Sequence, residues 1–372
     1  MNAASFSPQQ TAAIDAVGAW LAAGERQVFR LFGYAGTGKT TLAKHLASLQ
    51  NKPVRFGAFT GKAAKVLRNK GCADASTIHG MIYKSELDEK TGLYSYQKDH
   101  DAMSDVGLVI IDECSMVGED VGKDLLSFGK PVLVLGDPAQ LPPVNGAGFF
   151  TEHDPDFMLD EVHRQASESP ILRLATDIRL GKMPQWSMSV GDLKVIPTEE
   201  VDREAVLAAD AVLVGRNQTR ANYNRRIREL RGYYGAFPNE GETLICLKND
   251  RAAHVMNGGL WSVHKRKRSL NSPDGEVLRF ELEDQDRPGH YQPVKVFEHF
   301  FQGPERIKEL PWQSKRGTQE FDYGYAITVH KSQGSQWRDV MVFDESGVFG
   351  PDRGRHLYTA VTRAAEKLTL VI

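Results

Sequence analysis

The chain has 372 residues, of which 41% are hydrophobic and 25% are charged, and its formal net charge is -2. This is the composition of an ordinary globular protein, and the length exceeds what one hydrophobic core usually supports, so we expect two or more domains. The near-neutral charge excludes a protein that is basic throughout, so any nucleic-acid site must be a local basic groove.

The cysteines and the apolar segments bear on the compartment. The three cysteines, Cys72, Cys114 and Cys246, lack metal-like spacing and cannot all pair within one chain. They favour a reducing, cytoplasmic compartment. The N-terminus lacks the pattern of a signal peptide, and no apolar stretch approaches membrane-spanning length, so we expect no membrane association.

The first predicted helix begins at Pro8. Ser7 suits the N-cap position and Pro8 the first helical position, and the apolar residues between 12 and 21 can form a buried face. Residues 28–32 then form an apolar run that predicts a buried strand. The spacing of apolar residues in 41–49 predicts a second helix.

The turn between this strand and this helix carries the strongest motif. Residues 33–40 read Gly-Tyr-Ala-Gly-Thr-Gly-Lys-Thr, which matches the phosphate-binding loop of ATP- and GTP-using proteins. Its backbone N–H groups and the helix N-terminus would hold phosphates, with Lys39 on the β- and γ-phosphates and Thr40 on Mg²⁺. A chance match is disfavoured by the strand before and the helix after. The amide of Gln10 offers donors and an acceptor for the adenine edge, although such a residue is commonly only solvated. The predicted ATP contacts in and beside the loop are Gln10, Gly33, Ala35, Gly36, Thr37, Gly38, Lys39, Thr40 and Thr41.

Two further junctions expose polar residues before short helices. Residues 54–59 predict a strand that runs into Thr60-Gly61-Lys62, and a similar junction follows at 76–80. Free backbone N–H groups beside small polar residues suit phosphodiester contacts, whereas simple helix capping is the plainer interpretation of each junction alone. The candidate DNA contacts here are Thr60, Gly61, Lys62, Thr77 and His79.

A polar segment at 84–103 interrupts this pattern. It predicts a small hairpin that turns near Thr91-Gly92. An aromatic-tipped hairpin could act as a wedge in a duplex, and the alternative is an ordinary surface loop.

Two more predicted strands deliver acidic and amide side chains. The apolar run 106–111 ends in Asp112-Glu113, and the run 131–135 is followed by a Pro-rich loop that contains Gln140. Asp112 would hold the Mg²⁺ shell, Glu113 would polarise the attacking water, and Gln140 would sense the γ-phosphate. Four strands with helices between them predict a parallel α/β sheet, with the site at its carboxyl ends.

In this order, the stretches 33–40, 60–64, 77–79, 112–115 and 136–143 resemble the first motor domain of superfamily 1 helicases. Their details are similar to the RecD/Dda-like branch, which moves 5′→3′ on DNA. The resemblance implies a second motor domain that brings arginines to the ATP.

The second half of the chain contains stretches similar to the remaining motifs. Residues 159–165 are similar to the fourth motif, which implies that Arg164 contacts the γ-phosphate. Residues 325–336 match the fifth motif, and residues 357–364 resemble the sixth, with Arg363 as the arginine finger. The fifth motif implies Gly334 near the nucleotide, and the DNA contacts implied in this half are Asn217, Thr328, His330, Lys331 and Ser332.

Two basic segments lie outside these motifs. The predicted helix 219–231 carries five arginines, and the run 265–268 reads Lys-Arg-Lys-Arg. Each is either a solvated face or a DNA-backbone contact. The second run lies among alternating segments that predict strands between 242 and 297.

The resemblance therefore implies two RecA-like parallel-sheet motor domains with a small SH3-like β-barrel and a short hairpin as insertions. The expected domains are 1–83 with 104–180 (first motor), 84–103 (hairpin), 181–241 with 321–372 (second motor) and 242–320 (barrel).

The expected activity is that of an ATP-dependent DNA helicase or translocase with Mg²⁺ held by Thr40 and Asp112. Expected partners are single-stranded DNA, its junctions with duplex DNA, and single-strand-binding, replication, repair or recombination proteins, with the chain acting as a monomer. One alternative is a motor subunit of a recombination or nuclease complex that needs a partner. The other is a phosphate-loop small-molecule kinase, which the later motifs argue against.

Overall fold

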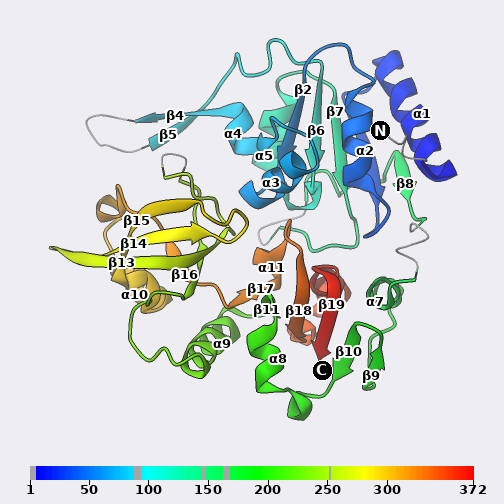
Figure 1. Ribbon diagram of the computed structural model, residues 1–372. Coiled ribbons are helices and arrows are strands. Elements are labelled where there is room, and N and C mark those ends of the chain that lie inside the picture. The colour runs from blue at the N-terminus through cyan, green and yellow to red at the C-terminus, as the bar shows by residue number, and fades with distance from the viewer. Residues whose placement is uncertain (1–5, 88–93, 144–147, 162–167, 251–252) are drawn as a thin grey trace. The chain divides into compact units, whose positions relative to one another are not determined.

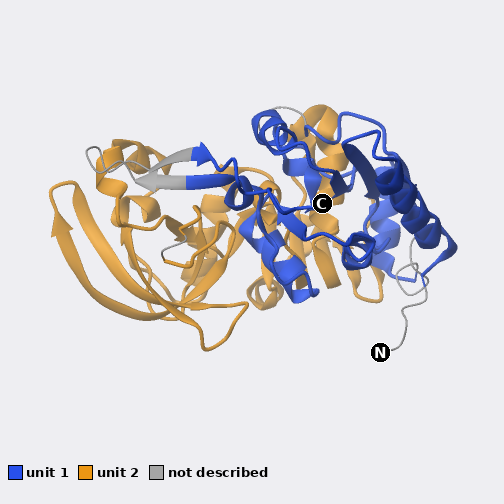
Figure 2. Ribbon diagram, turned by 90° about the horizontal axis from the view of Figure 1, so that it is seen from above, with its two compact units in different colours: residues 1–182 blue, residues 183–372 orange. Residues whose placement is uncertain are grey.

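The computed structural model (Figure 1) describes residues 6–87, 94–143, 148–161, 168–250 and 253–372. The chain divides into two compact units, residues 1–182 and 183–372, which are coloured separately in Figure 2. Each unit contains its own six-stranded sheet.

The first unit contains a six-stranded sheet in which all neighbours are parallel, in the order β3-β2-β6-β7-β1-β8. The four strands predicted from apolar runs are confirmed, within two residues at either end. The edge strand β8 was not predicted. The strands are β1 (Val28–Gly33), β2 (Val54–Ala58), β3 (Ser76–Thr77), β6 (Leu108–Asp112), β7 (Val132–Gly136) and β8 (Phe157–Leu159).

Helices cover both faces of this sheet. Apolar side chains of α1 and α2 form one core with β1, β6 and β7, and those of α4 and α5 form another on the opposite face. Because both faces are covered, β6 and β7 are buried along their whole length, which explains why they are continuous apolar runs. The helices are α1 (Pro8–Ala23), α2 (Lys39–Ala47), α3 (Gly61–Asn69), α4 (Ile78–Ile82), α5 (Glu119–Leu126) and α7 (Pro170–Arg179), with the 3₁₀ turn η1 (Cys114–Met116).

The predicted hairpin is also present. Strands β4 (Tyr83–Leu87) and β5 (Tyr94–Lys98) pair antiparallel, with Tyr83 opposite Lys98. The predicted turn at Thr91-Gly92 lies outside the described residues.

The second unit contains another six-stranded sheet, in the order β17-β11-β18-β19-β10-β9. Its strands are parallel except for β9, which pairs antiparallel with β10. The strands are β9 (Met188–Val190), β10 (Leu193–Ile196), β11 (Ala211–Val214), β17 (Ala326–Thr328), β18 (Trp337–Phe343) and β19 (Ala364–Val371). The helical elements are η2 (Thr198–Glu200), α8 (Arg203–Ala208), α9 (Asn217–Leu230), α11 (Val329–Ser332), η5 (Ser346–Asp352) and α12 (Arg353–Val361).

A separate five-stranded antiparallel sheet interrupts the second unit between α9 and β17, in the order β15-β14-β13-β12-β16. Its own core includes Trp261, Phe280 and Phe321. Register shifts interrupt the long β13–β14 pairing, which is how antiparallel strands bend. The strands are β12 (Thr243–Cys246), β13 (Leu260–Ser272), β14 (Gly275–Asp284), β15 (Tyr291–Phe297) and β16 (Phe321–Tyr323), with η3 (Glu298–Phe301), α10 (Pro304–Glu309) and η4 (Trp312–Lys315).

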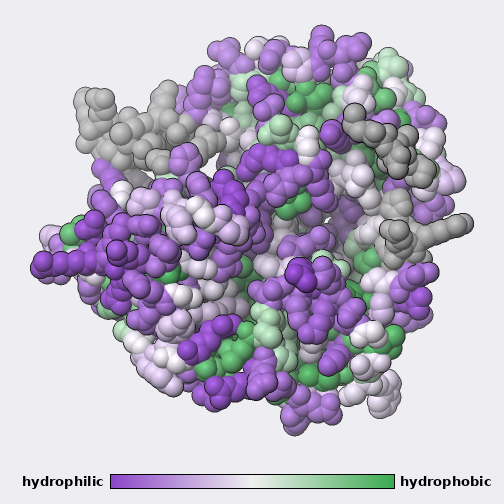
Figure 3. Space-filling view, viewed as in Figure 1, coloured by the Kyte–Doolittle hydropathy of each residue, from purple (hydrophilic) through white to green (hydrophobic). Residues whose placement is uncertain are grey.

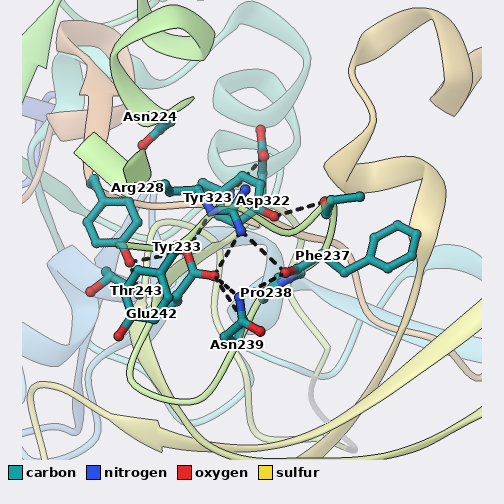
Figure 4. A network of polar contacts seen from close by, with 12 residues as sticks. Asn224, Arg228, Tyr233, Phe237, Pro238, Asn239, Glu242, Thr243, Asp322 and Tyr323 are labelled. Atoms are coloured by element: carbon teal, nitrogen blue, oxygen red, sulfur yellow. Dashed lines mark hydrogen bonds and ion pairs between the residues drawn. The ribbon is translucent and has the colours of Figure 1, made fainter. Parts of the chain in front are cut away.

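A buried ion pair joins this sheet to α9 (Figure 4). The Arg228 guanidinium donates to both oxygens of Glu242, at 2.6 and 2.9 Å, and lies over the ring of Tyr323, 4.0 Å from its centroid. Glu242 lies where the chain enters the five-stranded sheet, before β12, and Tyr323 lies where it leaves, at the end of β16. Arg228 therefore contacts both connections between this sheet and the rest of the second unit. Arg220 likewise pairs with Asp322, at 2.8 Å. Arg231 donates to the Leu207 carbonyl at 2.7 Å, so three of the five arginines in 219–231 contact other parts of the fold, an outcome that neither expected alternative included.

The surface of the five-stranded sheet is strongly polar. Figure 3 shows hydrophilic side chains gathered over the β13–β14 hairpin. Within the basic run, Lys265 and Arg268 are exposed, whereas Lys267 pairs with Glu281 at 2.8 Å. Among the described residues, none of the helices has the length and apolarity that crossing a membrane requires.

The three cysteines are free thiols inside the fold. Cys72 lies beside α3, Cys114 follows β6, and Cys246 ends β12, and each is at most 1% exposed. Burial raises the pKa of all three thiols, that of Cys246 to about 12.

Candidate nucleotide and DNA site

The phosphate loop is shaped by glycines at three positions. At Gly33 a Cβ atom would come within 2.7 Å of both Leu159 Cβ and Thr37 Oγ1, so only glycine fits where β1 meets β8. Gly36 and Gly38 have φ of 81° and 84°, the left-handed region that glycine enters without strain. Gly38 is also the N-cap of α2. The loop therefore curls at the N-terminus of a helix, as phosphate binding requires.

Lys39 is folded back over this loop. Its ammonium donates to the carbonyl oxygens of Gly33, at 2.5 Å, and Tyr34, at 3.0 Å. The Thr37 hydroxyl donates to the same Tyr34 carbonyl at 2.9 Å. The Arg179 guanidinium stacks on the Tyr34 ring, 3.7 Å from its centroid, a contact that was not predicted.

The second predicted half of the site meets the loop at Thr40. The Thr40 hydroxyl donates to Asp112 Oδ2 at 3.0 Å, although 72 residues separate them in sequence. Asp112 is buried, and desolvation together with the charge of Glu113 raises the pKa of its carboxyl, against the hydrogen bond from Thr40. A hydroxyl and a carboxylate at this spacing are the protein ligands that Mg²⁺ takes beside nucleotide phosphates.

Glu113 has an unusual backbone. Its φ of 53° and ψ of 45° are left-handed, one of two such non-glycine residues among those described. Its N–H donates to Asp112 Oδ1 at 2.9 Å, which gives the conformation a local partner. Strain of this kind, held beside a buried carboxylate, is typical of functional sites.

Gln140 is buried where β7 gives way to its Pro-rich loop. The Asp137 carboxylate accepts from the N–H of Ala139 at 3.0 Å and so forms the turn that carries it. Gln140 is 7% exposed, and its Oε1 has no hydrogen-bond partner among the described residues. A buried amide oxygen without a partner is costly, so Gln140 remains a candidate for contact with a bound ligand.

Gln10 is placed differently from the prediction. Its amide nitrogen donates to the carbonyl of Thr37 in the phosphate loop at 3.1 Å, and its amide oxygen accepts from the N–H of Ser7 in a capping box. The side chain is buried and supports the loop from behind. Thr41, in contrast, is exposed on the first turn of α2.

The neighbouring Gln9 holds the start of the segment that leads to Arg164. Its amide oxygen accepts from the N–H groups of Asp160 and Glu161, at 3.1 and 3.0 Å, and its amide nitrogen donates to the Asp160 carboxylate. Arg164 itself lies outside the described residues.

Of the predicted DNA contacts in the first unit, the two threonines act as helix caps. Thr60 accepts from the N–H of Ala63 and Thr77 from that of Gly80, both at 3.1 Å. Each hydroxyl still has its own hydrogen to donate. Gly61 and Lys62, the other two candidates at this junction, are buried in the first turn of α3. His79 lies between the rings of Phe59 and Tyr83.

The predicted DNA and nucleotide contacts of the second unit differ in how far they are exposed. Thr328 caps α11 and is itself buried, whereas His330 and Lys331 are half-buried on that helix, where desolvation lowers the pKa of each. Ser332 has no exposed surface, and its hydroxyl donates to the Val329 carbonyl at 2.7 Å, so it holds the turn instead of facing a ligand. Asn217 is exposed at the start of α9, and Gly334, with φ of 73°, ends the α11 turn.

Arg363 is held just after α12. It is 3% exposed, and its guanidinium donates to the carbonyls of Thr359 and Ser335 and to the hydroxyl of Thr362, at 3.0 to 3.1 Å. Among the described residues it has no carboxylate partner within ion-pair distance. Its charge is therefore solvated only by neutral oxygens.

Comparison with known proteins covers both units. Residues 5–196 match the AAA domain family, and residues 323–371 match the UvrD-like helicase C-terminal domain. The chain is 30% identical to the ATP-dependent RecD2 DNA helicase of Deinococcus radiodurans over 97% of this chain and 48% of that protein. It is 34% identical to the ATP-dependent DNA helicase dda of Enterobacteria phage T4, over 40% of this chain and 37% of that protein. The chain thus spans less than half the length of either relative.

Solved structures agree on the fold. A Bacteroides Pif1 helicase in complex with ADP-AlF3 and ssDNA has a TM-score of 0.60 at 18% identity, covering 99% of this chain and 92% of that chain. A Pif1 helicase from Candida albicans has a TM-score of 0.56, with 99% and 94% covered. The parallel α/β cores are those of RecA-like motor domains. From the family matches over both units, the chain belongs to the RecD/Dda-like branch of the superfamily 1 helicases.

Proposed function

We propose that this chain hydrolyses ATP to move along single-stranded DNA in the 5′→3′ direction and to unwind duplex DNA. The observation that carries the proposal is the bond between Thr40 and Asp112, which joins the phosphate loop to the acidic end of β6. The names of the RecD2 and Dda relatives support the DNA substrate. The direction rests on membership of the branch.

In the proposed reaction, Lys39 leaves the loop carbonyls for the β- and γ-phosphates, and Glu113 polarises the attacking water. Gln140 uses its unmet amide oxygen to place that water against the γ-phosphate. Arg164 and Arg363 stabilise the negative charge that develops as the bond breaks.

Mg²⁺ fits the residues present. Among the described residues, no group of three or more His, Cys, Asp or Glu could hold a metal alone. The pair of Thr40 and Asp112 instead offers the two oxygen ligands that Mg²⁺ needs when phosphates and water supply the rest. When bound, the ion would neutralise phosphate charge during hydrolysis.

In this proposal, the single-stranded DNA is contacted by the helix caps Thr60, Thr77 and Thr328. Four further residues contact it: Asn217, His79, His330 and Lys331. Hydroxyls and N–H groups at helix starts bind phosphates without reading bases. Binding should therefore be insensitive to sequence and should weaken strongly with salt.

The domain roles follow the same proposal. Residues 1–83 with 104–180 and residues 181–241 with 321–372 act as the two motors, and the hairpin at 84–103 separates strands. The five-stranded sheet acts as a small SH3-like barrel, formed by residues 242–320 together with β16, which pairs with β12 and which the expected boundary at 320 wrongly left in the second motor. Its antiparallel order and the register shifts between β13 and β14 support a strongly bent sheet, as a small barrel requires.

The test uses two duplexes, one with a 5′ single-stranded tail and one with a 3′ tail, with ATP and Mg²⁺. We expect unwinding from the 5′ tail, ATP turnover that rises with single-stranded DNA, and loss of both in Lys39→Ala with strand binding retained. Unwinding from the 3′ tail alone would overturn the direction. ATP turnover that does not change with DNA would favour the small-molecule kinase. Turnover that DNA stimulates, without unwinding of either duplex, would favour the motor subunit that needs a partner.

A further inference from the structure

Three aromatic rings from three elements of the second unit meet at one point. His330 of α11, Phe349 of η5 and His356 of α12 form what is here named the ring cluster. The Phe349 and His356 rings are stacked, with centroids 4.0 Å apart and planes 16° apart. The centroid of the His330 ring lies 5.7 Å from that of Phe349 and 6.2 Å from that of His356.

The cluster joins the proposed strand contacts to the proposed arginine finger. His330 lies on the strand-contacting turn that Thr328 caps. His356 lies on α12, and this helix also carries Thr359, whose carbonyl accepts from Arg363. A displacement of α12 therefore carries an acceptor of the Arg363 guanidinium with it.

Phe349 is fixed from a third side. A Cβ atom at Gly215 would lie 3.0 Å from the Phe349 ring, so this ring packs directly on the backbone before α9. The carboxylate of Glu345 accepts from the N–H groups of Gly215 and Arg216 and from the Thr219 hydroxyl, at 2.6 to 3.0 Å. The start of α9, which presents Asn217, is thus tied to the same cluster.

His356 is the member that packing does not explain. It is 1% exposed, and neither ring nitrogen has a hydrogen-bond partner among the described residues. Burying hydrogen-bonding nitrogens without partners is unfavourable, and phenylalanine in the same stack would avoid that cost. Burial lowers the pKa of His356 to about 4, so at neutral pH the ring is uncharged, with one donor and one acceptor.

We propose that His356 is a positioning residue that couples strand contact at α11 to the placement of Arg363. Because the rings touch in a close-packed interior, His330 cannot change its rotamer to meet a phosphate without displacing Phe349 or His356. The nitrogens of His356 then gain partners in the strand-bound arrangement, which favours the matching position of α12. This inference rests on the proposed function, since it requires a strand at α11 and a nucleotide at Arg363.

The test compares His356→Phe with the matched variant His299→Phe. His299 is also buried in the second unit with an unmet ring nitrogen, but it lies beside Phe297 and the β13–β14 turn. ATP turnover is measured without DNA and with saturating oligothymidine, and oligothymidine affinity by fluorescence anisotropy. In His356→Phe we expect the stimulation ratio to fall about tenfold, with basal turnover and affinity within about twofold of the starting protein. His299→Phe keeps its ratio.

An unchanged ratio in His356→Phe would overturn the inference, and so would an equal loss in His299→Phe or a loss of strand affinity that accounts for the lower ratio. Should His356→Phe not fold, Phe349→Leu breaks the stack and leaves His356 in place. A reduced ratio in Phe349→Leu supports the coupling, and an unchanged ratio refutes it. Absence of stimulation in the starting protein would instead refute the proposed function, so the two failures are distinguishable.

Discussion

The second unit buries two arginines in opposite ways. Arg228, 7% exposed, faces a carboxylate, because Glu242 accepts from it with both oxygens. Arg363, 3% exposed, donates to two carbonyls and one hydroxyl, and these are its hydrogen-bond partners in the described part of the chain. Both arginines are buried, but among the described residues only Arg228 has an ion-pair partner.

The difference separates a structural arginine from one whose charge is available. A buried cation beside a carboxylate is balanced, and an incoming anion would have to displace that carboxylate. A buried cation that is hydrogen-bonded to neutral carbonyl and hydroxyl oxygens, as Arg363 is, is not neutralised and still attracts an anion. His356 completes the series: with no partner for its nitrogens among the described residues, it stays neutral.

The largest expected effect is on catalysis through Arg363. In Arg363→Ala the DNA-stimulated turnover of ATP should fall about 10³-fold or more, because charge on the departing γ-phosphate loses its counter-charge. Nucleotide affinity should change by less than about threefold, since the arginine acts mainly in the transition state. Steady-state turnover and equilibrium binding of a fluorescent ATP analogue measure the two. Equal losses in both would assign Arg363 to binding alone.

Arg228→Ala should instead act on stability. It leaves Glu242 buried without its partner, which costs about 3–5 kcal/mol of unfolding free energy, as measured by urea denaturation. Turnover per folded molecule should stay close to that of the starting protein well below the unfolding midpoint. Arg228→Met with Glu242→Leu should recover most of the loss. A double variant as unstable as the single one would contradict a purely structural pair.

The third prediction concerns acid. His356 has its pKa at about 4 in the folded chain and near the ordinary value of about 6.5 when unfolded. Between these values the unfolded chain binds a proton that the folded chain refuses, so stability falls as the pH is lowered from about 6.5 to 4, by about 3 kcal/mol in total. His356→Phe should remove that part of the pH dependence of urea denaturation. Equal acid sensitivity in both proteins would show that His330, Asp344 and Glu345 around it compensate.

The smallest effects compare two buried glutamines of the first unit. Gln140→Ala removes an amide with an unmet oxygen and should lower kcat about 10- to 100-fold with little change in KM. Gln10→Ala removes a bond to the phosphate loop and should raise KM about fivefold for ATP and GTP alike. A KM increase confined to ATP would restore Gln10 as the reader of adenine.

Most of the first unit could be predicted because its signals are local. Strands β6 and β7 are buried on both faces and so are continuous apolar runs, and Ser7-Pro8 marks the start of α1 by capping chemistry alone. Short edge strands carry no such signal. β8 has three residues and β9 has three exposed ones, and both exist only because a neighbouring strand offers them hydrogen bonds.

The candidate site divides in the same way. Lys39, Thr40 and Asp112 could be placed from spacing, because strand ends of a parallel sheet converge. The use of Gln10, the burial of Ser332 and the partner of Arg228 could not, because each depends on a contact made across the fold. The arginine-rich pattern of α9 is the same whether Arg228 faces solvent or Glu242.

The buried thiols make the chain convenient for single-molecule fluorescence. Maleimide dyes react with thiolates, and burial keeps Cys72, Cys114 and Cys246 protonated and out of reach at neutral pH. Ala22→Cys on α1 and Glu204→Cys on α8 would add one exposed thiol to each unit without removal of any native cysteine. Energy transfer between dyes at these two positions would then report the distance between the units through each step of the ATP cycle.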